Sequence, residues 1–356
     1  MNGLDKNKID KELRTPASII NFLLPKYTKK KFVIINKVTD LMFKGRALTK
    51  KISYSQFFIK REDKSELRLC VYTPKEPVKN AVGLLWIHGG GYAMSVPEQD
   101  IYFIKQFVEA ENCIVVAPDY TRSVEKPFPA ALNDVYLALK WMVTNAKTIG
   151  ISSSKIFVGG DSAGGGLTAA LTLLARDRGE FAIAFQILIY PMLDSRETNS
   201  SKNNTMPVWN TKSNRVAWKT YLKNQLKPDK YAVPALETDY SNLPPALSYV
   251  GDLDPFLDET KNYVEQLKKH KIKVDFKIFN GCYHVFDVIG KKTRVGKQSK
   301  EFLLNGFKYA VNHYSKKQPR WLFDKKNNYC YYFLRIVLCR LKNILKINQS
   351  YIMKII

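Results

Sequence analysis

Cysteine is scarce in this chain of 356 residues, and it follows neither a metal-binding nor a disulfide spacing. The five cysteines are Cys70, Cys113, Cys282, Cys330 and Cys339. Their number is odd, they are widely scattered, and no two of them form a C-x-x-C pair. We therefore expect neither a disulfide framework nor a zinc site, and we expect a reducing compartment.

Long hydrophobic runs are also absent. No stretch of about 18 uninterrupted apolar residues occurs, so the sequence predicts no membrane-spanning helix. Residues 1–8 lack the basic-then-apolar order of a secretory signal. These absences predict a cytoplasmic protein, with association to a membrane surface left open.

Acidic residues are rare at the two ends of a chain whose net charge is +25. Residues 1–80 carry 19 Lys and Arg against 8 Asp and Glu, and residues 291–356 carry 16 against 2. Residues 81–290 carry 22 of each sign. A basic periphery can attract an anionic surface, but a solvated lysine-rich face without any partner has the same composition. We expect no nucleic-acid partner.

Apolar runs and helical patterns alternate along the middle of the chain. The predicted buried strands are residues 81–87, 113–117, 155–158, 185–190, 246–250 and 274–279. The predicted helices are residues 99–111, 130–145, 167–174, 258–269 and 297–314. A hairpin at residues 56–59 and 67–72 precedes them. This order predicts an α/β fold, a mostly parallel sheet covered by helices on both faces.

One stretch combines a strand, a glycine-rich turn and a helix. Gly160-Asp-Ser162-Ala-Gly164 fits the pattern G-x-S-x-G, with a strand before it and a helix after it. A serine on such a sharp turn projects its hydroxyl above the sheet, and the positions two before and two after it must lack a side chain. The serine also lies at a helix N-terminus, where free N–H groups favour developing negative charge. The pattern predicts a nucleophile at Ser162.

A second glycine-rich turn follows the strand at residues 81–87. It reads His88-Gly-Gly-Gly91, and its backbone N–H groups are free to point at a ligand. Fixed donors of this kind stabilise the oxyanion of an acyl-transfer intermediate. Alone, the same glycines are also compatible with a flexible turn.

A serine nucleophile needs a base, and the base needs an acceptor that fixes its tautomer. Of the four histidines, only His284 follows a late strand, in the loop layer where Ser162 is expected. Asp252 and Asp254 both follow the strand at 246–250, so either could supply the acid. The carboxyl ends of parallel strands meet at one edge of a sheet, and there these groups could converge.

Four of these stretches together resemble the hormone-sensitive-lipase-like esterase family of α/β-hydrolases. They are His88-Gly-Gly-Gly91, Gly160-Asp-Ser-Ala-Gly164, Asp254-Pro-Phe-Leu-Asp-Glu259 and His284. The resemblance implies an eight-stranded sheet with a helical cap, and covers about residues 50–314. It implies Ser162 as nucleophile, His284 as base and Asp254 as acid.

The same resemblance implies roles for the backbone. Gly89, Gly90 and Ala163 would donate the N–H groups of the oxyanion hole, while His88 and Gly91 would support the loop. The chemistry implied is that of a serine carboxylesterase or lipase, which hydrolyses short-to-medium acyl esters of small molecules through an acyl-enzyme. No metal and no cofactor takes part. Two alternatives stay open: a deacetylase of amides or acetyl sugars, and a non-catalytic small-molecule binder on the same fold.

The expected organisation has three parts. Residues 1–50 would form the N-terminal part of the cap, and residues 51–315 the catalytic domain with a cap insertion at about 195–242. Residues 316–356 would form a basic amphipathic extension, with Leu334 and Leu338 on one face of a helix. Such a helix is typical of peripheral membrane contact, but also of packing on the body or on a second subunit, so a homodimer is left open.

Overall fold

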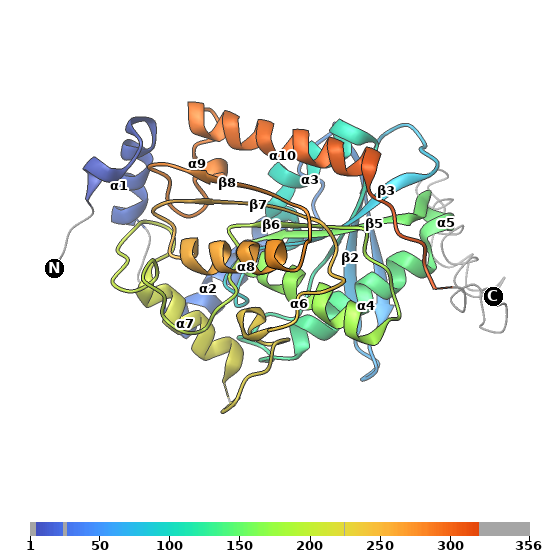
Figure 1. The fold of residues 1–356 in the computed structure, drawn as a ribbon, viewed down its shortest axis with the longest axis horizontal. Coiled ribbons are helices and arrows are strands. Elements are labelled where there is room, and N and C mark those ends of the chain that lie inside the picture. Colours follow the sequence, from blue (N-terminus) through green and yellow to red (C-terminus); the bar gives the residue numbers. More distant parts are fainter. Residues whose placement is uncertain (1–4, 24–26, 224, 320–356) are drawn as a thin grey trace. The chain divides into compact units, whose positions relative to one another are not determined.

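The computed structural model describes residues 5–23, 27–223 and 225–319. They form one eight-stranded sheet with helices on both faces (Figure 1). The strands are β1 (Ser53–Lys60), β2 (Glu66–Thr73), β3 (Ala81–Ile87), β4 (Ile114–Pro118), β5 (Ile151–Asp161), β6 (Phe185–Ile189), β7 (Ala246–Gly251) and β8 (Val274–Phe279). The helices are α1 (Arg14–Leu23), α2 (Lys29–Phe43), α3 (Ile101–Glu111), α4 (Ala130–Thr144), α5 (Ala146–Ile149), α6 (Ala163–Arg178), α7 (Thr211–Leu222), α8 (Leu257–Lys269), α9 (Phe286–Ile289) and α10 (Arg294–His313). Short 3-10 turns are η1 (Lys6–Lys8), η2 (Lys11–Leu13), η3 (Pro97–Asp100) and η4 (Pro234–Leu236).

The strand order explains how distant loops meet. It is β1-β2-β4-β3-β5-β6-β7-β8, with β2 antiparallel to β1 and β4 and every other pair parallel. The carboxyl ends of β3, β5, β7 and β8 therefore lie along one edge, where open α/β sheets bind ligands. The predicted α/β architecture and its mostly parallel sheet are confirmed.

The strand before Ser162 is longer than the apolar pattern indicates. We expected residues 155–158, but β5 begins at Ile151 and ends at Asp161. Ile151 pairs with Ala81, and a register shift separates this pair from the regular ladder between β3 and β5. The prediction was too short because the polar Ser152–Ser154 segment lies in the partly exposed first half of the strand.

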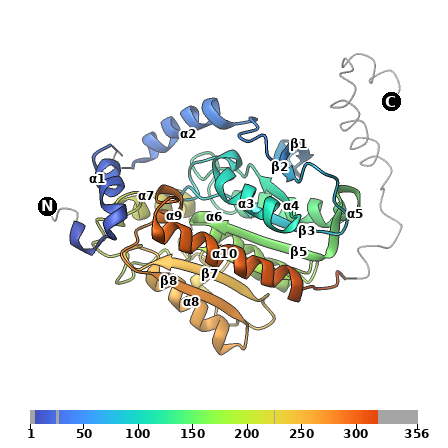
Figure 2. The same ribbon diagram turned by 90° about the horizontal axis from the view of Figure 1, so that it is seen from above.

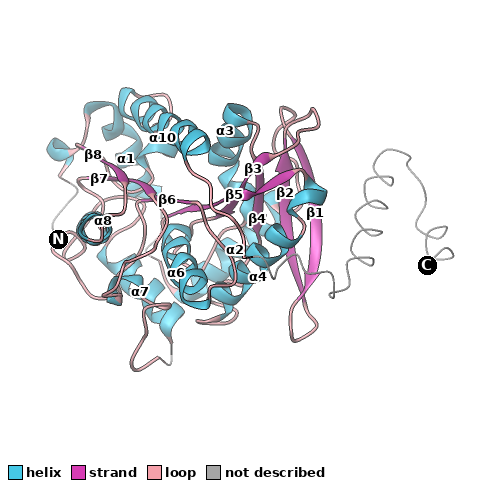
Figure 3. Cartoon of the chain, turned by 45° about the vertical axis from the view of Figure 1, so that its right-hand side comes forward, coloured by secondary structure: helices cyan, strands magenta, loops and turns pink. Residues whose placement is uncertain are grey.

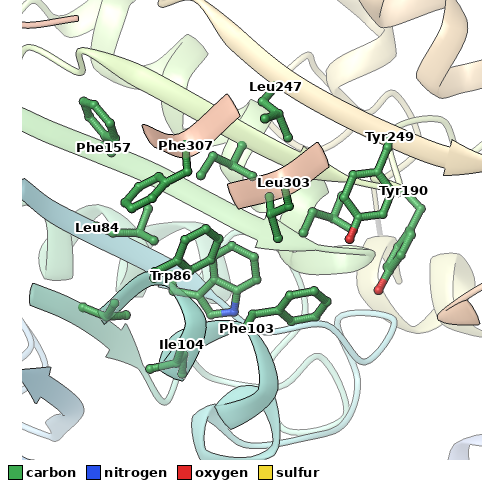
Figure 4. Close-up of a cluster of buried hydrophobic side chains, with 14 of the residues drawn as sticks. Leu84, Trp86, Phe103, Ile104, Phe157, Tyr190, Leu247, Tyr249, Leu303 and Phe307 are labelled. Atoms are coloured by element: carbon green, nitrogen blue, oxygen red, sulfur yellow. The ribbon is translucent and has the colours of Figure 1, made fainter. Parts of the chain in front are cut away.

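Two hydrophobic layers hold the sheet between its helices. Figure 3 shows α3 and α10 on one face of the sheet and α4, α6 and α8 on the other. On the first face Trp86 packs on Phe103 and Phe107, with ring centroids 5.3 and 5.2 Å apart, and Phe107 meets Phe307 at 4.8 Å (Figure 4). Burying each such side chain stabilises the fold by about 1.5–3 kcal/mol. The core makes β3 and β5 a rigid base for the loops that follow them.

The segments expected to build a cap lie together. α2 packs against α7, which belongs to the long connection between β6 and β7. Figure 2 shows α2 between α1 and the β1–β2 hairpin. That residues 1–50 and 195–242 act as one cap over the site stays a prediction.

The predicted C-terminal extension is described only up to residue 319. The helix expected around Leu334 and Leu338 lies outside the described residues, so its membrane contact stays a prediction. Within the described ranges, no helix is long and apolar enough to cross a bilayer.

Candidate active site

The turn that carries Ser162 has an unusual backbone. Ser162 follows β5 directly and precedes α6, with φ 52° and ψ −120°. A β-carbon on Gly160 would lie 2.4 Å from the carbonyl oxygen of Ile87, and one on Gly164 would lie 1.9 Å from the same oxygen. Both glycines are therefore required by the close approach of α6 to the end of β3, as the sequence pattern predicts. This packing holds the serine hydroxyl in one place.

The structure brings together three side chains from three different loops. His284 Nε2 lies 2.9 Å from Ser162 Oγ, and His284 Nδ1 lies 2.7 Å from Asp254 Oδ2. All three side chains are buried. Because a carboxylate only accepts hydrogen bonds, Nδ1 carries the proton and Nε2 is free to accept one from the serine hydroxyl. The arrangement can deprotonate Ser162 as its oxygen attacks a carbonyl.

The geometry separates the two aspartates that the residues alone left open. Asp254 is fully buried; its Oδ1 accepts the N–H of Phe256 at 2.9 Å, which leaves Oδ2 to accept from His284. Asp252 Oδ1 instead accepts the N–H of Cys282 at 3.2 Å. Asp254 thus orients the imidazole, whereas Asp252 fastens the loop that carries it.

The glycine loop after β3 presents unused backbone donors. Gly90 has φ +113°, and its carbonyl accepts the N–H groups of Ala93 and Met94, both at 3.0 Å. Within the described residues, no loop, cap or side-chain hydrogen bond uses the N–H of Gly89, Gly90 or Ala163. Ala163 is the first residue of α6, where N–H groups have no partner in the helix. These are the three donors that the resemblance implies.

His88 supports this loop as a neutral side chain. Its ring is fully buried and stacks on Tyr120, with centroids 4.2 Å apart. Burial lowers the pKa of His88 to about 4, so at neutral pH its Nδ1–H donates to the Gly89 carbonyl at 2.8 Å. The Tyr120 hydroxyl donates to the His88 carbonyl at 3.0 Å. His88 and Tyr120 therefore hold the glycine loop in place, and His88 does so without adding a positive charge near Ser162.

Sequence reasoning did not single out the aromatic side chain that covers the loop. Trp209 lies in the connection between β6 and β7, and a β-carbon on Gly91 would come within 2.3 Å of its ring. The Trp209 ring centroid is 6.4 Å from that of His284 and 5.5 Å from that of Tyr27. The only signal in the sequence is a cluster of aromatic residues within a polar stretch. Trp209 forms a wall beside the site.

The N-terminal segment braces the loop that carries His284. The N–H of Asp10 donates to the Gly281 carbonyl at 2.9 Å. Arg294, at the start of α10, donates from its backbone to Glu12 at 2.8 Å and from its guanidinium to Asp10 at 2.8 Å. These contacts join residues about 280 positions apart in sequence, and no local pattern predicts them.

A pair of buried carboxyl groups lies behind the glycine loop. The carboxyl groups of Asp161 and Asp100 lie close enough to shift each other's pKa, and Trp86 Nε1 donates to Asp100 at 2.7 Å. Burial raises the pKa of Asp100 to about 6, and burial together with the charge of Asp100 raises that of Asp161 well above its usual value. A β-carbon on Gly89 would lie 2.6 Å from Asp161 Oδ2. Two buried carboxyl groups this close do not both ionise readily, so the pair retains a proton to higher pH than an isolated aspartate does.

This pair predicts how stability depends on pH. In the unfolded chain an aspartate has a pKa of about 3.9, so the folded state binds more protons above that pH. The free energy of unfolding should therefore fall as pH rises from about 4 through the folded pKa of Asp100, about 6, and on toward that of Asp161. We expect Asp161→Asn, whose amide can still donate to Asp100, to reduce the loss between pH 5 and pH 8 by about 1–2 kcal/mol.

Urea unfolding at several pH values measures this difference. The control is Asp63→Asn, because Asp63 is an exposed carboxylate whose pKa is lowered to about 2 by hydrogen bonds from Ser65. It is ionised throughout the range, so its replacement should leave the slope above pH 5 unchanged. Equal slopes for the wild type and Asp161→Asn would contradict the shared proton.

The described residues contain no group of three or more His, Cys, Asp or Glu side chains that could hold a metal ion. The chemistry available at the site is that of a hydroxyl, an imidazole, a carboxylate and backbone N–H donors.

Comparisons with known proteins agree with this geometry. The model of the family described as alpha/beta hydrolase fold matches residues 84–288. An AB hydrolase superfamily protein of Schizosaccharomyces pombe is 31% identical over 241 residues, which are 63% of this chain and 70% of that protein. Carboxylesterase NlhH of Mycobacterium tuberculosis is 30% identical over 224 residues, which are 59% of this chain and 68% of that protein.

Solved structures extend the likeness over most of the chain. The structure of a protein named Bacterial Heroin Esterase superimposes with a TM-score of 0.79 at 29% identity, and the match covers 86% of this chain and 98% of that one. The resemblance seen in the glycine loop and the serine turn is thus confirmed: the chain belongs to the alpha/beta hydrolase fold family, among the hormone-sensitive-lipase-like esterases.

Proposed function

We propose that this protein hydrolyses short-to-medium acyl esters of small molecules with Ser162 as nucleophile, His284 as base and Asp254 as its orienting acid. The observation that carries the proposal is the unbroken series of hydrogen bonds from Ser162 Oγ through His284 to Asp254, 2.9 and 2.7 Å long. The names of the relatives, a carboxylesterase and an esterase, support an ester as the substrate class.

The first half of the reaction forms an acyl-enzyme. Ser162 Oγ attacks the ester carbonyl carbon while His284 Nε2 takes the hydroxyl proton, which gives a tetrahedral intermediate with a negative oxygen. The N–H groups of Gly89, Gly90 and Ala163 donate to that oxygen. His284 then returns its proton to the alkoxide, the bond between carbonyl carbon and alkoxide oxygen breaks, and the alcohol leaves.

Water completes the second half by the same route. It attacks the acyl carbon while His284 takes one of its protons, and the second tetrahedral intermediate collapses as the proton passes to Ser162 Oγ. The carboxylic acid leaves and the serine hydroxyl is restored. Asp254 keeps Nδ1 of His284 protonated throughout and stabilises the imidazolium that forms twice in each turnover.

Trp209 is the residue that we expect to limit acyl length. Its ring lies against Gly91 and faces His284, so it borders the space next to Ser162. A series of p-nitrophenyl esters from acetate to palmitate should show the highest kcat/KM at short or medium chains. Trp209→Phe should raise the kcat/KM ratio of octanoate to acetate by about tenfold, because one or two methylene groups in a pocket are worth this much.

A matched variant separates pocket shape from general loosening. Trp218 is also a buried indole of the same connection, but its ring packs on Tyr92 and Tyr221, and among the described residues no aromatic pair joins it to His284. Trp218→Phe should leave the octanoate-to-acetate ratio unchanged. An equal shift in both variants would remove Trp209 from its proposed role.

The same preparation tests the two alternatives. A fluorophosphonate probe should label the wild type at Ser162, whereas a non-catalytic binder would react poorly. Hydrolysis of p-nitroacetanilide faster than that of p-nitrophenyl acetate would favour an amide deacetylase and contradict the ester proposal.

A further inference from the structure

Helix α2 presents two chemically different faces. Its inner face buries Phe32, Asn36 and Thr39. Asn36 Nδ2 donates to the carbonyl of Ala93, in the turn that follows the glycine loop, at 2.9 Å. On the flank, Asp40 forms an ion pair with Arg122 at 2.8 Å. These contacts fix α2 against the body, so the direction of its outer face is determined.

The outer face is apolar although it faces solvent. Large apolar side chains that are exposed in the described part of the chain are concentrated between residues 19 and 48, which hold eight of twelve. On α2 they include Ile34, Val38, Leu41 and Met42, between 50% and 76% exposed, and on α1 they are Ile19 and Phe22, 53% and 88% exposed. Exposed apolar side chains that are concentrated in one part of a chain usually mark an interaction site. We call these six side chains the α1–α2 face.

Basic residues surround this face. Residues 29–51 carry eight Lys and Arg against a single acid, Asp40, which is already paired with Arg122. Along α2, Lys30 lies four positions before Ile34, and Lys37 lies three positions after Ile34 and four before Leu41. Within the described residues, no ion pair involves Lys29, Lys30, Lys31 or Lys37. The charge that borders the apolar side chains is therefore not neutralised by the body.

We infer that the α1–α2 face docks on an anionic lipid bilayer, with its apolar side chains in the headgroup layer and the surrounding lysines at the lipid phosphates. An exposed apolar stripe flanked by lysines is typical of helices that lie in a membrane interface. Each Lys or Arg near an anionic surface adds to the attraction. A second copy of this chain fits less well, because a two-fold contact would bring two lysine-bordered faces together, and the single acid within residues 29–51, Asp40, is already paired with Arg122.

The α1–α2 face lies close to the candidate site, so docking would affect which substrates reach Ser162. Tyr27, directly before the cap of α2, stacks on Phe32 at 5.4 Å and lies 5.5 Å from Trp209, the wall beside Ser162. In a docked molecule, Tyr27 and Trp209 would lie near the bilayer surface. The substrates would therefore include esters that partition into membranes. This last step depends on the proposed ester hydrolysis, whereas docking itself does not.

Vesicle sedimentation of the full chain tests docking directly. Wild-type protein should sediment with vesicles of phosphatidylcholine containing 30 mol% phosphatidylserine at low salt, about tenfold more than with phosphatidylcholine alone. Ile34→Ser/Leu41→Ser, which keeps every charge, should lower binding by about tenfold. Lys30→Glu/Lys37→Glu should lower it as strongly, and more so at low salt than at high salt.

The matched control is Leu226→Ser, because Leu226 is 98% exposed but lies outside the α1–α2 face. It should bind like the wild type. All of these positions are exposed, so thermal unfolding should be unchanged in each variant. Ser162→Ala should also sediment like the wild type, so a failure of hydrolysis does not affect this test.

Two results would overturn the inference. One is undiminished sedimentation of both double variants, which would assign any lipid binding to another part of the chain. The other is a dimer in size-exclusion chromatography with light scattering that becomes a monomer in Ile34→Ser/Leu41→Ser, which would make the face a contact between two copies.

Discussion

Ser162→Ala is expected to lower kcat/KM for p-nitrophenyl acetate by at least about 10⁴-fold, and labelling by a fluorophosphonate should disappear. The reason is that the alanine variant keeps the imidazole and the oxyanion donors but has no atom that can form the acyl bond. Any remaining rate would come from substrate binding and from the free N–H groups, which still stabilise the oxyanion when water attacks. Stopped-flow or long-incubation assays at saturating and limiting substrate measure the loss.

Two comparisons make this result specific. Ser123 is a buried serine with the same exposed fraction as Ser162, 4%, and Ser123→Ala should keep full activity. The double variant Ser162→Ala/His284→Ala should be no slower than Ser162→Ala, because groups that act as one unit are strongly non-additive. A further large loss in the double variant would show that His284 acts independently of Ser162.

Gly164→Ala should destabilise the protein by about 4 kcal/mol or more, enough to lose soluble protein. The added carbon would lie 1.9 Å from the carbonyl oxygen of Ile87 and 2.7 Å from that of His88. Both neighbours are backbone atoms of the segment that leads into the glycine loop, so neither can move aside without displacing the oxyanion donors. Urea unfolding measures stability, and the hydrolysis rate of whatever protein folds measures the displacement.

The opposite end of the same helix supplies the control. Gly179 follows α6 with φ +62° and has no atom within 4 Å of an added β-carbon. Gly179→Ala should therefore lower the free energy of unfolding only through its strained backbone conformation, by about 1–2 kcal/mol. If the two variants were equally stable, steric approach between α6 and β3 would not be what requires glycine at position 164.

Much of the sheet can be predicted from the local pattern of apolar residues in the sequence. Strands such as β3 and β4 are buried on both faces, so their sequences are continuous apolar runs that predict a strand without further information. The ends of strands are harder to predict. β5 begins four residues before its apolar run because Ile151 pairs with Ala81, a contact that the polarity of the sequence does not reveal. Where a strand begins and ends depends on which strand it pairs with, and a single sequence does not show this pairing.

In the candidate site, too, some residues can be predicted from local sequence and others cannot. Ser162 and the glycine loop are found from sequence because a sharp turn and a close helix approach demand glycine at fixed offsets. The choice of Asp254 over Asp252 depends on where two loops meet, so the residues alone left it open. Trp209 and Asp161 act through contacts with residues that are distant in the sequence, and no spacing rule marks these contacts.

The brace between the N-terminal segment and the loop of His284 has a practical consequence. Asp10 is hydrogen-bonded to Gly281, and Arg294 is hydrogen-bonded to both Asp10 and Glu12. A protease cut or an affinity tag just before Leu13 would break these bonds and so change the position of the His284 imidazole. Preparations trimmed at this end would then differ in turnover while remaining identical in their serine, histidine and aspartate.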